Sequence, residues 1–330
     1  MTTLITGATG FVGSAVAHVL ARRGHALRLL TRPASDRRNL AGLDAEIVTG
    51  DLTDPASLAR AAAGCRYVVH VAADYRFWVP VPAEMMRANV EGAVAMIRAA
   101  ADAGAERIVH CSSVAALGQI GDGTPADEAT PTNEADFVGI YKRSKYLAER
   151  AVLDLAAKES LPVIVVNPAA PVGPRDIKPT PTGKMVLDAA AGRIPAYIDT
   201  GLNVVHVDDV AEGHALALEK GRIGERYVLG GENLLLKDLL ALIADVAGQR
   251  PPRIRLPEPV IWPIAWIMEK TARLTGIPPL MTTDHLKMAR KKMFYSSAKA
   301  KAELGFTARP ARQAVEDAVA WFRVMGMLRA

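Results

Sequence analysis

The feature that most constrains the fold of this chain is a set of three glycines near its N-terminus. Gly7, Gly10 and Gly13 follow a short apolar run and open a helical pattern. The first permits a tight turn, the second lets backbone N–H groups approach a pyrophosphate, and the third lets strand and helix pack closely. The alternative is an ordinary strand-to-helix turn, but strand and helix stand where a dinucleotide site requires them. We assign to a cofactor site Gly7, Gly10, Phe11, Val12 and Gly13.

The first half of the chain alternates short apolar runs with longer helical patterns. We expect strands at residues 4–6, 27–30, 46–48, 67–71, 107–111 and 162–166, and helices at 11–23, 55–63, 83–103 and 139–160. The strand runs are continuously apolar, which indicates burial on both faces. This alternation predicts an α/β fold with a doubly wound parallel sheet, the Rossmann arrangement.

The pattern changes after Asn167. Prolines cluster at positions 168, 171, 174, 179 and 181 and mark a long loop. A strand at 204–207, a helix at 210–220 and a strand at 226–229 are expected to return to the sheet. We predict a dinucleotide-binding domain of residues 1–167 plus 204–229, and a smaller, mostly helical substrate lobe of residues 168–203 plus 230–330. Ligands of such sheets bind outside the carboxyl ends of the strands.

Charge and cysteine content exclude several classes of function. The net charge is +5, but the densest basic run, residues 287–292, has no interleaved aromatic residues for base stacking, so we expect no nucleic-acid partner. Cys65 and Cys111 lie in or near buried strands without metal-ligand spacing, so we predict no metal site and a reducing compartment. The first strand begins at residue 3, leaving no room for a signal peptide. We therefore expect a cytoplasmic protein.

The end of the second strand indicates which dinucleotide binds. An NAD site usually carries Asp or Glu there to hold the ribose 2′-OH. This chain has Thr31 followed by Arg32, with Arg37 and Arg38 close by. Arg32 is expected to hold a 2′-phosphate by charge-assisted hydrogen bonds, whereas Arg37 and Arg38 fit a solvated loop equally well. We predict NADP(H) as the preferred cofactor, with NAD(H) as the alternative.

Two further pairs fit the walls of a cofactor site. Asp51 and Leu52 follow the third strand, where a carboxylate can accept from an adenine amino group. Ala72 and Ala73 follow the fourth strand, where small side chains let the backbone pass the pyrophosphate. A plain buried strand terminus is the alternative for both pairs.

The residues suited to acid–base chemistry lie near the start of a helix. Tyr141 and Lys145 are four residues apart and share one helix face. A neighbouring ammonium is expected to lower the pKa of the phenol and bring it nearer the operating pH. Ser112 and Ser113 end the fifth strand, so a serine hydroxyl can reach the same sheet edge and bind the reacting oxygen.

Together these motifs resemble the extended short-chain dehydrogenase/reductases over essentially the whole chain. The matching pieces are Gly7/Gly10/Gly13, Asp51-Leu52, Ala72-Ala73, Asn89, Ser112-Ser113, Tyr141/Lys145, Asn167-Pro168 and His206 to Val210. The resemblance implies that Ser113 orients the substrate oxygen and Tyr141 transfers the proton. It also implies that Lys145 and Pro168 contact the cofactor and that Asn89 holds the catalytic helix and a water.

Longer segments narrow the resemblance. Residues 167–183 and 35–40 look like dihydroflavonol-4-reductase-like proteins and, more narrowly, the hopanoid-associated sugar epimerase group. This implies an NADP(H)-dependent oxidoreductase acting on a carbonyl or hydroxyl group in hopanoid side-chain biosynthesis, with a hopanoid lipid or sugar derivative as substrate. The alternative is a sugar epimerase with tightly bound NAD(P). A cofactor-binding regulatory protein is a third reading, disfavoured by intact Ser113, Tyr141 and Lys145.

Two departures bear on the substrate and on partners. Sugar-nucleotide epimerases of this kind carry an arginine for the diphosphate where this chain has Leu202, which argues against a UDP-sugar. Residues 259–292 combine Trp262 and Trp266 with apolar and basic residues. The stretch at 259–268 is far shorter than the roughly 20 residues that span a bilayer, so peripheral contact with the inner membrane is one hypothesis. Packing on the other lobe or on a partner subunit, as in a homodimer, is the alternative.

Overall fold

The computed structural model describes all residues except 77–78, 135–136, 276–281, 290 and 329–330. Its centre is a seven-stranded parallel sheet of order β10-β6-β5-β4-β1-β2-β3. The strands are β1 (Thr2–Thr6), β2 (Ala26–Thr31), β3 (Ala45–Thr49), β4 (Tyr67–His70), β5 (Arg107–Cys111), β6 (Val163–Pro168) and β10 (Arg226–Leu229). The predicted fold class, a doubly wound parallel α/β sheet, is confirmed.

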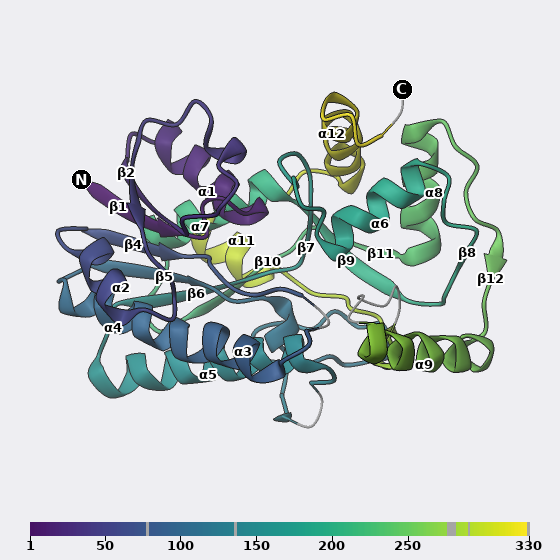
Figure 1. The fold of residues 1–330 in the computed structure, drawn as a ribbon, viewed down its shortest axis with the longest axis horizontal. Helices are drawn as coiled ribbons and strands as arrows, with labels where there is room; N and C mark the ends of the chain where they lie inside the picture. Colours follow the sequence, from purple (N-terminus) through teal and green to yellow (C-terminus); the bar gives the residue numbers. More distant parts are fainter. Residues whose placement is uncertain (77–78, 135–136, 276–281, 290, 329–330) are drawn as a thin grey trace.

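Helices cover both faces of this sheet, as Figure 1 shows. Successive strand residues alternate between two cores: Ile5 faces one cluster and Leu4 the other. The first cluster packs under α1 (Phe11–Arg22), α7 (Val207–Lys220) and α11 (Ala298–Leu304). The second packs under α2 (Pro55–Ala62), α4 (Gly92–Asp102) and α5 (Ile140–Glu159). Because both faces are covered, the strands carry apolar residues at consecutive positions.

The helical pattern at residues 83–103 forms three segments. It begins as α3 (Pro82–Met86), widens into a π-helical turn over Arg87–Glu91, and continues as α4. Such π turns are rare and frequently occur at functional sites. This one carries Asn89.

The strand predicted at residues 204–207 does not return to the central sheet, so that expectation is wrong. It forms β9 (Gly201–His206), which pairs with β7 (Ala170–Val172) and β11 (Glu232–Leu235) in a separate sheet. The reason is that β7 begins at Ala170, directly after β6 ends at Pro168, and pairs with β9 outside the central sheet. Val172 and Val204 are then buried under α6 (Pro181–Ala190), α8 (Leu236–Ala247) and α12 (Ala311–Val324).

The C-terminal part of the chain also divides differently from the prediction. Ala300 and Leu304 of α11, followed by Phe306, are buried in the core of the nucleotide-binding lobe. By contrast, α9 (Glu258–Thr275) and α10 (Thr283–Ala289) lie at the edge of the second lobe, where β12 (Ile254–Arg255) pairs with β8 (Ala196–Tyr197). Among the described residues, no helix is both long and apolar enough to cross a bilayer.

Candidate active site

The loop between β1 and α1 packs closely on its neighbours only because its glycines lack side chains. Gly7 has φ +73°, and a Cβ on it would lie 2.7 Å from the Ala72 backbone nitrogen. A Cβ on Gly13 would lie 2.1 Å from the Gly7 carbonyl oxygen. The first turn of α1, at Phe11 and Val12, has no side-chain cap and no acidic residue, so its N–H groups and helix dipole favour an anion. These residues fit the pyrophosphate of a dinucleotide.

The edge beyond β2 carries basic side chains. Thr31 is buried, and Arg32 directly after it is exposed. The Arg38 guanidinium is paired with Asp36, at 2.7 Å, whereas Arg37 reaches the Thr31 hydroxyl, 3.5 Å away. Arg32 and Arg37 are therefore the cations that this edge offers to a 2′-phosphate, and Arg38 is engaged elsewhere.

The two pairs expected to line the cofactor site follow β3 and β4, and Ala72 of the second pair lies against Gly7 of the glycine loop. Oδ1 of Asp51 accepts hydrogen bonds from the Thr53 N–H (2.9 Å) and hydroxyl (2.7 Å), which lower the pKa of Asp51. Leu52 packs closely on α4: a Cβ added to Gly92 would lie 2.9 Å from the Cβ of Leu52. Ala72 and Ala73 follow β4, and the Ala72 N–H donates to the Thr6 hydroxyl, 3.1 Å away.

The structure brings Ser113, Tyr141 and Lys145 to the carboxyl edge of β5. The Tyr141 side chain hydrogen-bonds that of Ser113. The buried Lys145 ammonium donates to the Cys111 carbonyl oxygen at 3.0 Å. Ser113 also caps the short 3₁₀ turn Val114–Ala116 by accepting from the Ala115 N–H at 3.1 Å. A hydroxyl and a phenol thus lie together where a reacting oxygen would bind.

Asn89 links the π turn to the start of α5 through hydrogen bonds. Its side-chain amide donates to the Asp74 carbonyl (2.8 Å) and to the Ser144 hydroxyl (3.0 Å), and its oxygen accepts from the Asp74 N–H (2.7 Å). The Ser144 hydroxyl in turn donates to the Tyr141 carbonyl oxygen at 2.8 Å. The π turn is therefore linked to the first turn of α5, directly beside Tyr141 and Lys145.

The acidity of Tyr141 differs from the expectation. Burial raises the pKa of Tyr141 to about 12, and the hydrogen bond from Ser113 opposes this only in part. Burial also lowers the pKa of Lys145. The expected lowering of the tyrosine pKa by Lys145 is wrong for the protein alone, because the lysine points to the Cys111 carbonyl and desolvation dominates. A nicotinamide cofactor held at this edge would supply hydride chemistry, and the Tyr141 hydroxyl is placed where it could hold or release a proton at a substrate oxygen.

Two buried histidines beneath this site were not anticipated from the sequence. The rings of His70 and His110, on adjacent strands, lie 5.3 Å apart between centroids. His70 Nδ1 hydrogen-bonds the Thr6 hydroxyl at 2.7 Å. Burial, with a contribution from Lys145, lowers the pKa of His70 to about 3, so the ring is neutral at physiological pH. Both histidines stand inside apolar strand runs, where the sequence pattern gives no functional signal.

A second unanticipated feature anchors the Ser113 backbone. The Asn167 side-chain amide donates to the Ser113 carbonyl (3.0 Å) and to the buried Glu149 carboxylate (2.6 Å). Glu149 pairs with Arg226 at 2.9 Å. The network joins β6, α5 and β10, which fixes the strand end that carries the serine. Pro168 ends β6 next to Asn167 and is buried.

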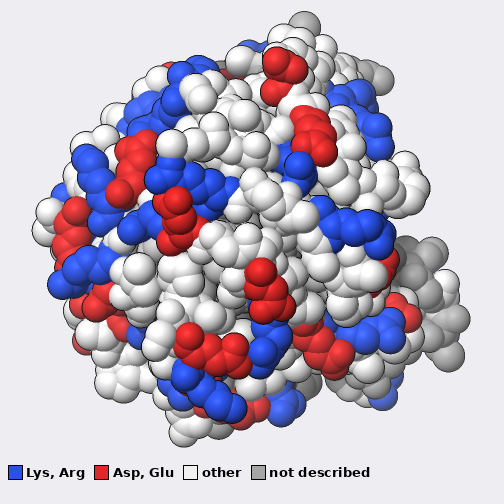
Figure 2. Space-filling view, turned by 90° about the vertical axis from the view of Figure 1, so that its left-hand side faces the viewer, with Lys and Arg blue, Asp and Glu red and all other residues white. Residues whose placement is uncertain are grey.

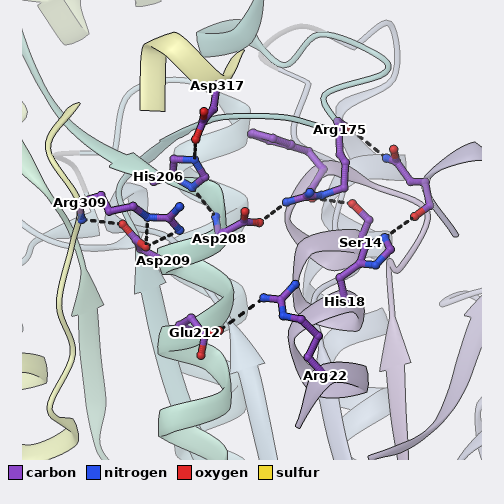
Figure 3. A network of polar contacts seen from close by, with 12 residues as sticks. Ser14, His18, Arg22, Arg175, His206, Asp208, Asp209, Glu212, Arg309 and Asp317 are labelled. Atoms are coloured by element: carbon purple, nitrogen blue, oxygen red, sulfur yellow. Dashed lines mark hydrogen bonds and ion pairs between the residues drawn. The ribbon is translucent and has the colours of Figure 1, made fainter. Parts of the chain in front are cut away.

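The second lobe is fastened to the glycine loop through Arg175, as Figure 3 shows. Arg175 has φ +78°, a left-handed conformation that is uncommon for a residue other than glycine. Its carbonyl oxygen accepts from the Asn39 amide at 2.9 Å, and the same amide lies 3.4 Å from the Thr9 carbonyl oxygen. Its guanidinium pairs with Asp208. The loop after β7 is thus held against the cofactor loop.

The position expected to carry a diphosphate-binding arginine is apolar in space as well as in sequence. Leu202 lies on β9, forms a bridge with Met293, and packs against the core of the second lobe. Two lysines, Lys291 and Lys292, directly precede Met293 in the sequence. Burial, together with Lys291, lowers the pKa of Lys142 to about 8. Lys142 is buried beside Tyr141 and was not singled out from the sequence.

The remaining described residues contain no group of three or more His, Cys, Asp or Glu side chains arranged to hold a metal ion. Cys65 and Cys111 are free thiols and are buried.

Comparison with known proteins gives three findings that agree with this geometry. The model of the NAD dependent epimerase/dehydratase family matches residues 3–230. A putative dihydroflavonol 4-reductase of Synechocystis sp. is 40% identical over 329 residues, covering 98% of this chain and 95% of that protein. Sterol demethylase protein B of Methylococcus capsulatus is 33% identical over 330 residues, covering 99% and 100%.

A solved structure extends the likeness to the whole fold. The crystal structure of gox2253 superimposes with a TM-score of 0.90 and 59% sequence identity, and covers 99% of each chain. The likeness therefore includes the second lobe and its three-stranded sheet as well as the nucleotide-binding lobe.

Proposed function

The chain belongs to the NAD-dependent epimerase/dehydratase family, and on that premise we propose that it is an NADP(H)-dependent oxidoreductase acting on a carbonyl or hydroxyl group. The observation that carries the proposal is the set of Ser113, Tyr141 and Lys145 at the carboxyl edge of β5, beside the dinucleotide loop. Ser113 binds the reacting oxygen, Tyr141 exchanges its proton, and Lys145 contacts the nicotinamide ribose. Asn89 positions these groups through Ser144.

The relatives support an apolar, ring-containing substrate. Their names include a putative dihydroflavonol 4-reductase and a sterol demethylase protein, whose substrate classes are fused-ring compounds with oxygen substituents. We place the reaction of this chain in hopanoid side-chain biosynthesis. Consumption of NADPH with dihydroflavonols and triterpenoid ketones tests the proposal. A rate no higher than that of a protein-free control for every such ketone would count against it.

The second candidate function is a sugar epimerase, which the family description favours. An epimerase oxidises and re-reduces its substrate on the same cofactor, so the oxidised cofactor is regenerated and no NADPH is consumed overall. A reductase converts one NADPH for each product molecule. The ratio of NADP⁺ formed to product formed therefore separates the two functions.

The first prediction concerns cofactor choice. NADPH is expected to bind more tightly than NADH, and Arg32→Ala is expected to remove roughly 10- to 100-fold of that preference, because charge-assisted hydrogen bonds contribute about 1.5–3 kcal/mol. Titrations followed by tryptophan fluorescence measure both affinities. Arg38→Ala is the matched control: its guanidinium is engaged by Asp36, so the preference should persist. Equal affinities for the two cofactors in the wild type would contradict the assignment.

The second prediction concerns UDP-sugars. They are expected not to be epimerised, because Leu202 offers no positive charge to a diphosphate. Incubation of the enzyme with UDP-glucose or UDP-galactose and either cofactor, followed by chromatography, measures this directly. The prediction fails if a UDP-hexose is converted at an ordinary enzymatic rate of about 1 s⁻¹ or faster.

A further inference from the structure

The outward face of α9 exposes a continuous group of large apolar side chains. Val260, Ile264 and Ile267 are 57%, 52% and 58% exposed. Trp262 and Trp266, one helical turn apart, are 38% and 49% exposed. The opposite side of the helix is anchored, with Ile261 and Ala265 buried against Leu286 of α10. The face formed by Val260, Trp262, Ile264, Trp266 and Ile267 is called the α9 face below.

This exposure is concentrated in one place. Elsewhere in the described structure, exposed large apolar residues stand singly, as Ile47, Ile120, Ile223 and Val324 do. Single exposed apolar residues are normal, whereas a contiguous group marks a surface that binds a partner. Figure 1 shows α9 at the periphery of the molecule, on the side of the second lobe away from β2 and β3.

The net positive charge of the chain is concentrated in the stretch of sequence that contains α9. Residues 250–292 contain nine Lys and Arg and three Asp and Glu, a net charge of +6, whereas the whole chain carries +5. The rest of the chain therefore has a net charge of −1. Arg253 and Arg255 are exposed just before α9, and the Lys270 ammonium lies 5.4 Å from the centre of the Trp266 ring. On the side shown in Figure 2, acidic and basic side chains are intermingled.

We propose that the α9 face is a docking surface for an anionic lipid bilayer. An in-plane helix with Trp and aliphatic residues on one side and basic residues around it buries its apolar face at the boundary between head groups and acyl chains. The basic residues are attracted to the negative surface of the membrane. A second copy of the chain is a poorer occupant, because pairing two α9 faces would bring two segments of charge +6 together.

The docking surface is connected to the catalytic helix. The Glu269 carboxylate of α9 accepts from the Thr283 N–H of α10 at 2.7 Å. Asp284 of α10 packs beside Gly139, so that a Cβ there would lie 3.6 Å from the Asp284 carboxylate oxygen. Gly139 precedes the first turn of α5, which carries Tyr141. An enzyme docked through α9 would therefore hold its catalytic edge near the source of an apolar substrate.

Vesicle co-sedimentation tests the proposal and needs neither cofactor nor turnover, so its result is independent of the proposed function. The wild-type protein is expected to pellet with vesicles of equal parts phosphatidylglycerol and phosphatidylcholine and to remain in solution with phosphatidylcholine alone. Raising the salt from about 0.05 M to about 0.5 M should weaken binding, because it shortens the screening length. Trp262→Ser/Trp266→Ser should lower the partition coefficient about tenfold or more.

The matched control is Ile223→Ser/Val324→Ser, which removes two exposed apolar side chains on other faces and should bind as the wild type does. Circular dichroism and thermal unfolding show that each variant is folded. The proposal is overturned if the wild type stays in solution with anionic vesicles at low salt, or if the tryptophan variant pellets equally. It is also overturned if sedimentation equilibrium gives a dimer that the tryptophan substitutions dissociate, with no vesicle binding, because the face is then a subunit interface.

Discussion

Replacing Tyr141 by Phe is expected to reduce turnover roughly 100- to 10,000-fold, the range typical of losing a general acid or base. The substitution removes only the hydroxyl that exchanges a proton with the substrate oxygen. NADPH affinity should change little, since the dinucleotide loop and Lys145 are intact. Single-turnover oxidation of NADPH with whichever ketone the wild type reduces measures the loss.

A matched control for this variant lies on the same helix. Tyr146→Phe also removes one phenolic hydroxyl, but the Tyr146 ring stacks on Phe137 at 4.3 Å. It should therefore keep nearly the full rate. The role of Tyr141 is wrongly assigned if its Phe variant retains more than about a tenth of the wild-type rate, because that loss lies below the acid–base range.

Gly13→Ala is expected to weaken cofactor binding roughly 100-fold and to destabilise the protein by about 3 kcal/mol. The new Cβ would lie 2.1 Å from the Gly7 carbonyl oxygen, so α1 and the loop must separate. Overpacking of this kind lowers the free energy of unfolding by about 3 kcal/mol. The clash is with backbone atoms, which cannot relieve it by changing rotamer. A loss of about 3 kcal/mol in the free energy of cofactor binding corresponds to a roughly 100-fold weaker affinity. Thermal unfolding and NADPH titration measure the two effects.

Gly10→Ala separates packing from binding. Its Cβ would meet only the Gly7 carbonyl oxygen, at 3.3 Å, so the fold should persist while a phosphate is kept from the start of α1. Its melting temperature should remain near that of the wild type and its NADPH affinity should fall. Wild-type NADPH affinity in Gly13→Ala would contradict the assignment of this loop as the cofactor site.

The sequence predicted the central sheet well because burial on both faces leaves a strong pattern. Continuous apolar runs such as Val163 to Val166 are short and rich in β-branched residues, which favours buried strands over helices, and the glycine motif fits a strand before it and a helix after it. The expected site residues Ser113, Tyr141 and Lys145 lie at one sheet edge because carboxyl ends of parallel strands meet there.

The errors concern features that periodicity does not encode. The apolar run at 204–207 was correctly read as a strand, but its pattern does not reveal whether it pairs with β10 or with β7. The π turn at Asn89 interrupts a helix whose spacing looks continuous. The pKa of Tyr141 depends on desolvation and on where the Lys145 ammonium points, and both are tertiary properties.

The central claim, net hydride transfer from NADPH to an apolar carbonyl compound, is tested most directly by isotope transfer. The enzyme is incubated with a triterpenoid ketone and with NADPH that carries deuterium at the C4 position from which hydride is transferred. Mass spectrometry then measures the deuterium content of the products. The expected product is an alcohol that carries one deuterium, formed in step with NADP⁺ and formed roughly 100- to 10,000-fold more slowly by Tyr141→Phe. Deuterium that remains in the cofactor while a sugar derivative changes its configuration would contradict it.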